Sequence, residues 1–351
     1  MRKFTSGFSL IELMVAMTIG LMVLTVLGTV FSRTSSGRGD LDRVSRLLET
    51  SRYAADLIGE DIRHAGFYGT FMPPSDTVFD DASPCAWSLT DAKALGWQPV
   101  GESASTAPHY PAPLQGWDVA PGATVSALKD CLPDPQVPGT DVLVIRRASS
   151  APVSPTQVAA VPAVYVQHTQ CVDEKVNERP NVIVSSDSKA FTLKTASCGS
   201  DLAEIRRYFV RIYYVASCND CAAGDGVPTL KRVEFTNSAK PQATTIAEGV
   251  QDLQFEYALD DLDAAGKAPP DGVLDGVPEK MVTLPTTWAN VVSIRMHALM
   301  RSSEPGLSAD TTPTRFNLGP DREDVSCPDR YRCRLMTSTF RLNNVAGRRE
   351  K

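Results

Sequence analysis

The sequence is poor in histidine, the side chain that most often moves protons at neutral pH. None of its histidines stands in a nucleophile, zinc or phosphate-binding motif, and the chain lacks the glycine-rich loops that cradle phosphate groups. These absences argue against an enzyme, and we expect no catalytic residue and no cofactor. The four histidines are His64, His109, His168 and His297.

Basic charge is also scarce. The 351 residues contain 35 lysines and arginines against 41 aspartates and glutamates, which gives a formal net charge of -6. No long run of basic residues occurs, whereas proteins that bind nucleic acid usually present a basic face. We therefore expect no nucleic-acid partner.

One long hydrophobic run interrupts an otherwise ordinary soluble composition. It extends from Phe8 to Phe31 behind the short basic leader of residues 1–7 and is long enough to cross a bilayer of about 30 Å as a helix. The apolar core of a secretory signal is shorter, about 7 to 15 residues, and is followed by a small-residue cleavage site that is absent here. The run is therefore a plain signal anchor, or it is cleaved on its leader side, between Gly7 and Phe8.

The hydrophobic run carries one acid, Glu12. A charge in the membrane costs about 3 kcal/mol on insertion scales, so such an acid usually has a function and a partner. The stretch "GFSLIELMVAM", with two basic residues before it, resembles the class III signal of type IV pilins and type II secretion pseudopilins. The resemblance implies that a prepilin peptidase cuts after Gly7 and N-methylates Phe8, and that Glu12 is the acid used in assembly.

The resemblance also implies a partner for Glu12. After cleavage, the α-amino group of Phe8 is a cation one helical turn from this carboxylate. The amine of one subunit can then meet the carboxylate of a neighbour, so that the two charges neutralise each other as the helices pack. The alternative is a plain anchor in which Glu12 lies near the end of the span.

The next segment, residues 32–66, predicts an amphipathic helix. Gly37 and Gly39 weaken the chain as it leaves the membrane, so we predict a flexible joint there. Apolar residues then recur at three- or four-residue steps, and the helix is predicted to end near Gly66. Its predicted apolar face consists of Leu41, Val44, Leu48, Ala55, Ile58, Ile62 and Ala65.

Residues 67–140 are rich in proline and glycine, which predicts an irregular insertion with short elements. We interpret Trp87, Trp97 and Trp117 as packing residues. From residue 141 to 351 the pattern changes to a period of two, which predicts antiparallel strands and an α+β fold with the helix covering one sheet face. The predicted strands are residues 141–147, 163–167, 181–186, 190–194, 204–217, 250–259, 291–302 and 338–344.

Several of these pieces, in this order behind the prepilin signal, resemble PilW-type minor pilins, which are related to the J-type minor pseudopilins of type II secretion. They are "PLQGWD", "PGTDVLVIRR", "RRYFVRIYYV", "GVPTLKRVEF" and "IAEGVQDLQFEYALD". The resemblance implies a pilin-like fold and a minor pilin that primes assembly and sits at the filament tip. The implied partners are the major pilin, other minor pilins, the prepilin peptidase, the inner-membrane assembly platform and a large tip adhesin.

The implied location is the inner membrane, with the globular part in the periplasm, and later the pilus surface. Two alternatives stay open. The first is a minor pseudopilin of a type II secretion system. The second is an anchored periplasmic binding domain that never polymerises.

Eight cysteines, an even number, predict disulfides in an oxidising compartment. The pair in "CNDC" has redox spacing, but it lies between strand patterns rather than at the start of a helix, which favours a disulfide in a hairpin loop. Eight cysteines allow about a hundred connectivities, so pairing by neighbourhood is a hypothesis. It joins Cys85 to Cys131, Cys171 to Cys198, Cys218 to Cys221, and Cys327 to Cys333.

The acidic loop after residue 260 has a partial calcium pattern. Asp261 and Asp263 are spaced like the first two ligands of an EF-hand loop. The third ligand position is Ala265 and the closing acid position is Gly272, so the pattern fails twice. A solvated loop is the favoured interpretation, and no metal site is predicted. Asp261 and Asp263 are kept as calcium candidates.

Overall fold

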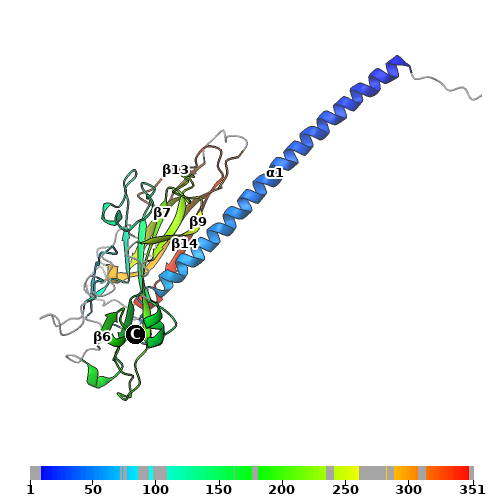
Figure 1. Cartoon of the computed structure of the whole chain (residues 1–351). Coiled ribbons are helices and arrows are strands. Elements are labelled where there is room, and N and C mark those ends of the chain that lie inside the picture. The colour runs from blue at the N-terminus through cyan, green and yellow to red at the C-terminus, as the bar shows by residue number, and fades with distance from the viewer. Residues whose placement is uncertain are drawn as a thin grey trace, which may run out of the picture.

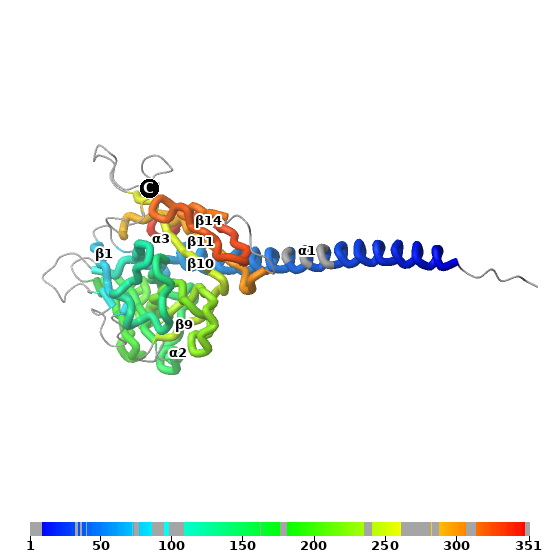
Figure 2. The backbone as a smooth tube through the Cα atoms, turned by 90° about the horizontal axis from the view of Figure 1, so that it is seen from above, coloured from blue at the N-terminus to red at the C-terminus, as the bar shows by residue number. Residues whose placement is uncertain are grey.

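The protein consists of one long helix and a globular part built from β-sheets, and its N-terminal end projects far from that part (Figures 1 and 2). The structure is a computed structural model. It describes residues 9–71, 73, 77–85, 95–97, 109–161, 163–175, 181–234, 241–260, 282, 288–306 and 314–347.

The long helix, α1 (Leu10–His64), is continuous. The joint predicted at Gly37 and Gly39 is wrong, since the helix passes through both residues without a break. Each glycine costs about 1 kcal/mol relative to alanine, but a helix already nucleated on both sides gains a hydrogen bond with every residue it adds. The predicted end is confirmed, because the helix stops at His64 and Gly66 takes a φ of +70°.

The larger sheet has seven antiparallel strands. Their order is β3-β4-β7-β5-β6, and β8 pairs with both β7 and β9. The strands are β3 (Leu114–Trp117), β4 (Val142–Ala148), β5 (Tyr165–His168), β6 (Val182–Ser185), β7 (Ile205–Ala216), β8 (Thr229–Glu234) and β9 (Gln242–Glu248).

A second sheet of three antiparallel strands follows in the order β10 (Val250–Leu259), β11 (Val291–Arg301) and β14 (Cys333–Arg341).

The remaining elements are short. They are the parallel pair β1 (Val78–Asp80) and β2 (His109–Pro111), the antiparallel pair β12 (Arg315–Phe316) and β13 (Val325–Ser326), α2 (Pro155–Ala160), α3 (Asn343–Ala346), and the 3-10 turns η1 (Ser126–Leu128), η2 (Val172–Glu174), η3 (Ser188–Ala190) and η4 (Trp288–Asn290).

One strand prediction is wrong. Residues 190–194 form no strand, because the side chain of Gln167 takes the place of a neighbouring strand: its Oε1 accepts from the Leu193 N–H and its Nε2 donates to the Leu193 carbonyl, both at 3.0 Å. Within the segment predicted to have only short elements, the four-residue strand β3 pairs with β4 in the large sheet. Its Gly116 hides the strand pattern, and a Cβ there would lie 2.2 Å from the Tyr257 hydroxyl.

Strand β7 separates two hydrophobic cores, as its alternation predicts. Tyr213 and Val215 face the core shared by α1 and both sheets. The opposite core contains Trp97, which packs as predicted with its ring 5.4 Å from that of Tyr208. The β7 residues on that second side are Tyr208, Val210, Ile212, Tyr214 and Ala216.

The helix joins the first core only from Leu47 onward, through residues such as Ala54, Ile58 and Ile62. Part of the predicted apolar face is therefore wrong: Leu41 is 72% exposed and Val44 is 38% exposed. The spacing of apolar residues shows which face of the helix is apolar. How far along the helix this face is covered depends on the sheets beside it.

One glycine of α1 lies close to the second sheet. A Cβ at Gly59 would lie 2.4 Å from the Cε1 atom of Phe340 in β14. We expect Gly59→Ala to destabilise the globular part by about 1 to 3 kcal/mol through overpacking, despite the better helix propensity of alanine. Thermal unfolding in detergent would measure this. Gly37→Ala is the matched control, because nothing lies within 4 Å of its Cβ. A midpoint for Gly59→Ala equal to that of the control would refute the expected clash.

Candidate assembly interface on the N-terminal helix

The first part of α1, Leu10–Phe31, carries a large bare apolar surface, and we call it the stalk. Its 22 residues are long and apolar enough to cross a membrane, and none of that surface is buried within the protein. Figure 2 shows it projecting from the globular part. Because soluble monomers rarely expose an apolar patch of this size, the stalk requires lipid or other proteins around it.

The hydroxyl groups of the stalk are paired within the helix. Those of Thr18, Thr25 and Thr29 donate to backbone carbonyls three or four residues earlier, at 2.9, 2.6 and 2.8 Å. A polar group without a partner is costly in lipid. These three side chains are therefore compatible with a membrane or with the dry interior of a filament.

Glu12 lies in the first turn of the stalk and closes a capping box with Ser9. The Ser9 N–H donates to Glu12 Oε2 at 2.9 Å, and the Glu12 N–H donates to Ser9 Oγ at 3.2 Å. The carboxylate is therefore held beside the helix N-terminus, where the helix dipole favours negative charge. The predicted processing residues Gly7 and Phe8 lie outside the described residues.

The other end of α1 is fixed to the large sheet by a buried carboxylate, that of Asp61, which is 2% exposed. Its Oδ1 accepts from Arg147 Nε at 2.9 Å and from Arg211 Nη1 at 2.6 Å. Its Oδ2 accepts from Arg211 Nη1 at 2.9 Å and from the Tyr213 hydroxyl at 2.5 Å. Burial, followed by the neighbouring Asp61 carboxylate, raises the pKa of Tyr213, so its hydroxyl stays protonated and donates.

The two arginines that bind Asp61 have further support. Arg211 Nε donates to Glu234 on β8 at 2.9 Å, and the guanidinium groups of Arg147 and Arg211 lie 5.2 and 4.6 Å from the centre of the Phe209 ring. Burial lowers the pKa of Arg211, but the charges of Asp61 and Glu234 outweigh it and raise that pKa. The helix is thus joined to three strands by a charged cluster whose groups are hydrogen-bonded.

Asp61 was not predicted from the sequence as a functional residue. A usable signal was present, because Asp61 lies three residues after Ile58 and next to Ile62 on the apolar face of the helix. A single acid among buried positions needs a charged partner. Strand β7 contains Arg206, Arg207 and Arg211, but the pairing of Arg211 with the helix depends on how the sheet meets it.

The cysteines are joined as Cys85–Cys131, Cys171–Cys198, Cys218–Cys221 and Cys327–Cys333, which are the four pairs of the neighbourhood hypothesis. The first closes 46 residues of the proline-rich segment, and a closed loop of this length restricts the unfolded chain. Cys218–Cys221 lies in the loop between β7 and β8, not at the start of a helix.

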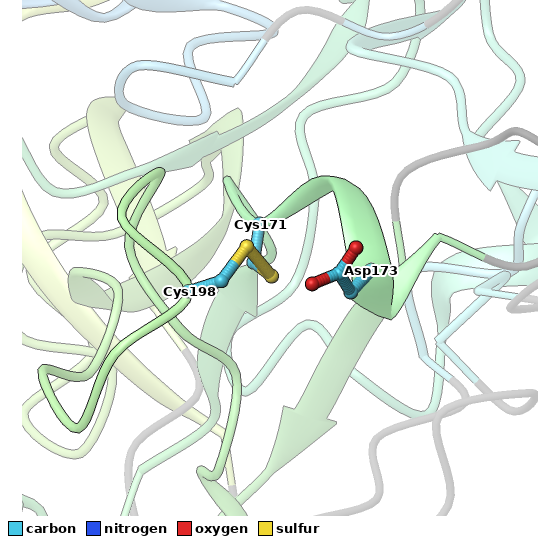
Figure 3. Close-up of side chains that lie close together, drawn as sticks. All are labelled: Cys171, Asp173 and Cys198. Atoms are coloured by element: carbon cyan, nitrogen blue, oxygen red, sulfur yellow. A yellow bond between two sulfur atoms is a disulfide. The ribbon is translucent and has the colours of Figure 1, made fainter.

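Three potential metal ligands lie together at Cys171, Asp173 and Cys198 (Figure 3). Both sulfur atoms belong to one disulfide, so neither is available as the thiolate that binds a metal. This cluster is therefore a disulfide beside an acid. The calcium candidates Asp261 and Asp263 lie outside the described residues.

The four histidines are dispersed over the fold. His64 Nδ1 contacts the Glu60 carbonyl at the end of α1, and His109 pairs with Asp80 at 2.8 Å. His297 Nε2 lies 2.8 Å from Glu256 on the three-stranded sheet. His168 is buried and stacks on Phe71. Each histidine therefore has a different partner.

Comparison with protein families gives two matches at separate parts of the chain. Residues 2–28 match the prokaryotic N-terminal methylation motif, which contains Glu12 and most of the stalk. Residues 212–344 match the type IV pilus-assembly protein W family, from the middle of β7 through the three-stranded sheet to α3. Comparison with curated proteins and with solved structures gave no significant match. The chain therefore combines a prepilin-type N-terminal methylation motif with a region similar to the type IV pilus-assembly protein W family.

Proposed function

We propose that the protein is a minor pilin that primes assembly of a type IV pilus and sits in the complex at its tip. The observation that carries the proposal is the bare stalk with one acid in its first turn, continuous with a helix whose other end is fixed in a folded domain. Such a subunit can exchange lipid around its stalk for the helices of neighbouring subunits.

Glu12 directs this exchange. After cleavage between Gly7 and Phe8, the N-methylated α-amino group of a neighbouring subunit pairs with the Glu12 carboxylate. Pairing neutralises two charges that are each costly in an apolar filament core. A helix inserted out of register leaves both charges unpaired, so the pair selects the axial position of each subunit.

The direction of the chain in the membrane follows from its charges and its disulfides. Arg2 and Lys3 precede the stalk, and basic residues next to a span stay on the cytoplasmic side. The four disulfides require an oxidising compartment. The globular part therefore lies in the periplasm before assembly. Its partners are the prepilin peptidase, the assembly platform, the major pilin, other minor pilins and a tip adhesin.

Mass spectrometry of the N-terminal peptide tests this proposal, applied separately to sheared surface filaments and to membranes. We expect a peptide that begins at N-methylated Phe8 in the sheared fraction. A processed peptide found only in membranes favours the alternative, a pseudopilin of a type II secretion system. An intact leader beginning at Met1 in every fraction contradicts processing and leaves an anchored domain.

A further inference from the structure

Strand β14 forms one edge of the three-stranded sheet and lies beside α1 (Figure 1). Its nine residues pair with β11 without a shift of register, and they include no proline, glycine or lysine. Natural sheets usually protect an edge strand from other chains by making it short, by interrupting it with a bulge, or by placing proline or lysine in it. β14 has none of these features.

The hydrogen bonds at the two ends of β14 show which of its backbone groups face outward. The Leu342 N–H donates to the Val292 carbonyl at 2.8 Å. The Ser302 N–H donates to the Arg332 carbonyl at 2.8 Å, in the same register as the ladder between them. Because hydrogen-bonded and non-hydrogen-bonded pairs alternate along an antiparallel ladder, the even-numbered residues of β14 bond to β11. The interior residues that point their N–H and carbonyl groups away from β11 are Leu335, Thr337 and Thr339.

These outward groups are open to another chain. No hydrogen bond within the described part of the chain reaches the backbone N–H or carbonyl group of Leu335, Thr337 or Thr339. Thr337 and Thr339 are exposed. The row of unpaired groups is therefore a template on which a strand of another chain can form a ladder.

The other sheet edges are closed, distorted or short. On the opposite edge of the same sheet, the Asp141 N–H donates to the Leu253 carbonyl at 2.9 Å, and the Phe255 N–H donates to Asp141 Oδ2 at 2.8 Å. In the large sheet, the edge strand β9 shifts its register against β8, and the edge strands β3 and β6 have four residues each. β14 is therefore the one long, regular and open edge among the strands that the structure describes.

The side chains of β14 indicate the chemistry of the strand that fits beside it. On its core side, Phe340 is buried and Met336 is partly buried. Arg334 and Arg341, near its two ends, are exposed, and the strand contains no acid. Pairing of two copies of β14 would double this positive charge, which disfavours a second copy as the occupant. A strand with apolar side chains at alternate positions and carboxylates among the others complements this edge.

We propose that the edge of β14 takes up such an acidic, amphipathic strand from a neighbouring subunit of the pilus tip. The added strand bonds to the outward groups of β14 at a spacing of about 4.8 Å, covers Met336 and places its carboxylates beside the arginines. This inference rests on the proposed function, since it names the surface through which the globular part holds a neighbour. It adds a contact that is separate from the packing of the stalk.

Thr339→Pro tests the proposal in cells. The Thr339 N–H points outward, so proline removes a bond to an added strand and leaves the bonds between β14 and β11 in place. We expect the recovery of this variant in sheared filaments to fall by about tenfold or more. Thr339→Ala is the matched control, because it removes the side chain and keeps the N–H group. It should be recovered as the parent chain is.

Near-ultraviolet circular dichroism in detergent establishes that each variant is folded. If Thr339→Pro fails to fold, Arg334→Glu decides the question through charge, because that side chain is exposed. We expect its recovery to fall by about tenfold as well. Lys189→Glu is its control, since Lys189 is exposed on η3, away from the second sheet.

Amide hydrogen exchange of the β14 peptide gives a second readout, with the parent chain compared in detergent and in sheared filaments. We expect slower exchange in the filaments. Equal exchange in the two states overturns the proposal, as does recovery of the folded Thr339→Pro variant, or of Arg334→Glu in its place, at the level of the parent chain. An equal loss for Thr339→Ala assigns the effect to the side chain and also overturns it.

These outcomes leave the assembly role intact, because the parent chain is still found in the sheared filaments. If the parent chain is itself absent from that fraction, the assembly role is contradicted and the strand partner with it.

Discussion

Glu12→Ala is expected to leave the protein inserted in the membrane and to lower its recovery in sheared filaments by about tenfold or more. The apolar length of the stalk is unchanged, so insertion persists. In the proposed assembly, however, the α-amino group of the neighbouring subunit would enter the filament core without a counter-charge. Immunoblots of sheared and membrane fractions from cells of equal expression measure the two effects.

A second substitution separates two roles of Glu12, the helix cap that it forms with Ser9 and the proposed charge pairing in assembly. Glu12→Gln keeps an oxygen that can accept the Ser9 N–H bond but removes the charge. If charge pairing drives assembly, the glutamine variant fails as the alanine variant does. If only the helix cap matters, the glutamine variant assembles normally and the pairing idea is wrong. Thr18→Ala controls for general damage to the stalk, because it removes one hydroxyl that bonds within the helix.

Asp61→Ala is expected to destabilise the globular part by about 3 to 5 kcal/mol, the usual cost of removing one partner from a buried ion pair. The substitution leaves Arg147, Arg211 and the Tyr213 hydroxyl without the carboxylate that binds all three. Its effect should extend to the helix, because Asp61 is the buried charge through which α1 is joined to β4 and β7.

Chemical unfolding in detergent measures the loss of stability, and limited proteolysis of residues 47–64 measures the release of the helix. Asp56→Ala is the matched control, since Asp56 lies on the same helix and is exposed. We expect a change within about 0.5 kcal/mol for this control. An Asp61→Ala variant as stable as the control would show that the cluster contributes little and that apolar packing alone holds the helix.

Much of the secondary structure follows from local patterns. In β7 the period of two is matched by the structure, because successive side chains of a strand point to opposite faces and here enter opposite cores. The strand predictions failed where a contact with a residue distant in the sequence overrode the local pattern. Gln167 satisfies the backbone at Leu193 in place of a strand, and Gly116 stands in a strand because the Tyr257 hydroxyl fills the space where a Cβ would be.

Only some residues of the candidate site could likewise be identified from the sequence. The bare stalk and Glu12 could be identified from the sequence, because a long apolar run and an acid within it have a meaning independent of the rest of the fold. Asp61 was not identified as a site, since its partners are about 90 and 150 residues away along the chain. The exposure of Leu41 and Val44 likewise depends on where the globular part begins to touch the helix.

The sequence by itself therefore determined the apolar helix, its acid, the α+β class and the strand faces, because these depend on hydrophobic period and on the cost of charge in an apolar medium. Only the tertiary structure decided which charges meet and which parts of the helix are covered. It also decided that β14 lies at the edge of its sheet. Such contacts join residues far apart in the chain, and no local pattern specifies the distance between them.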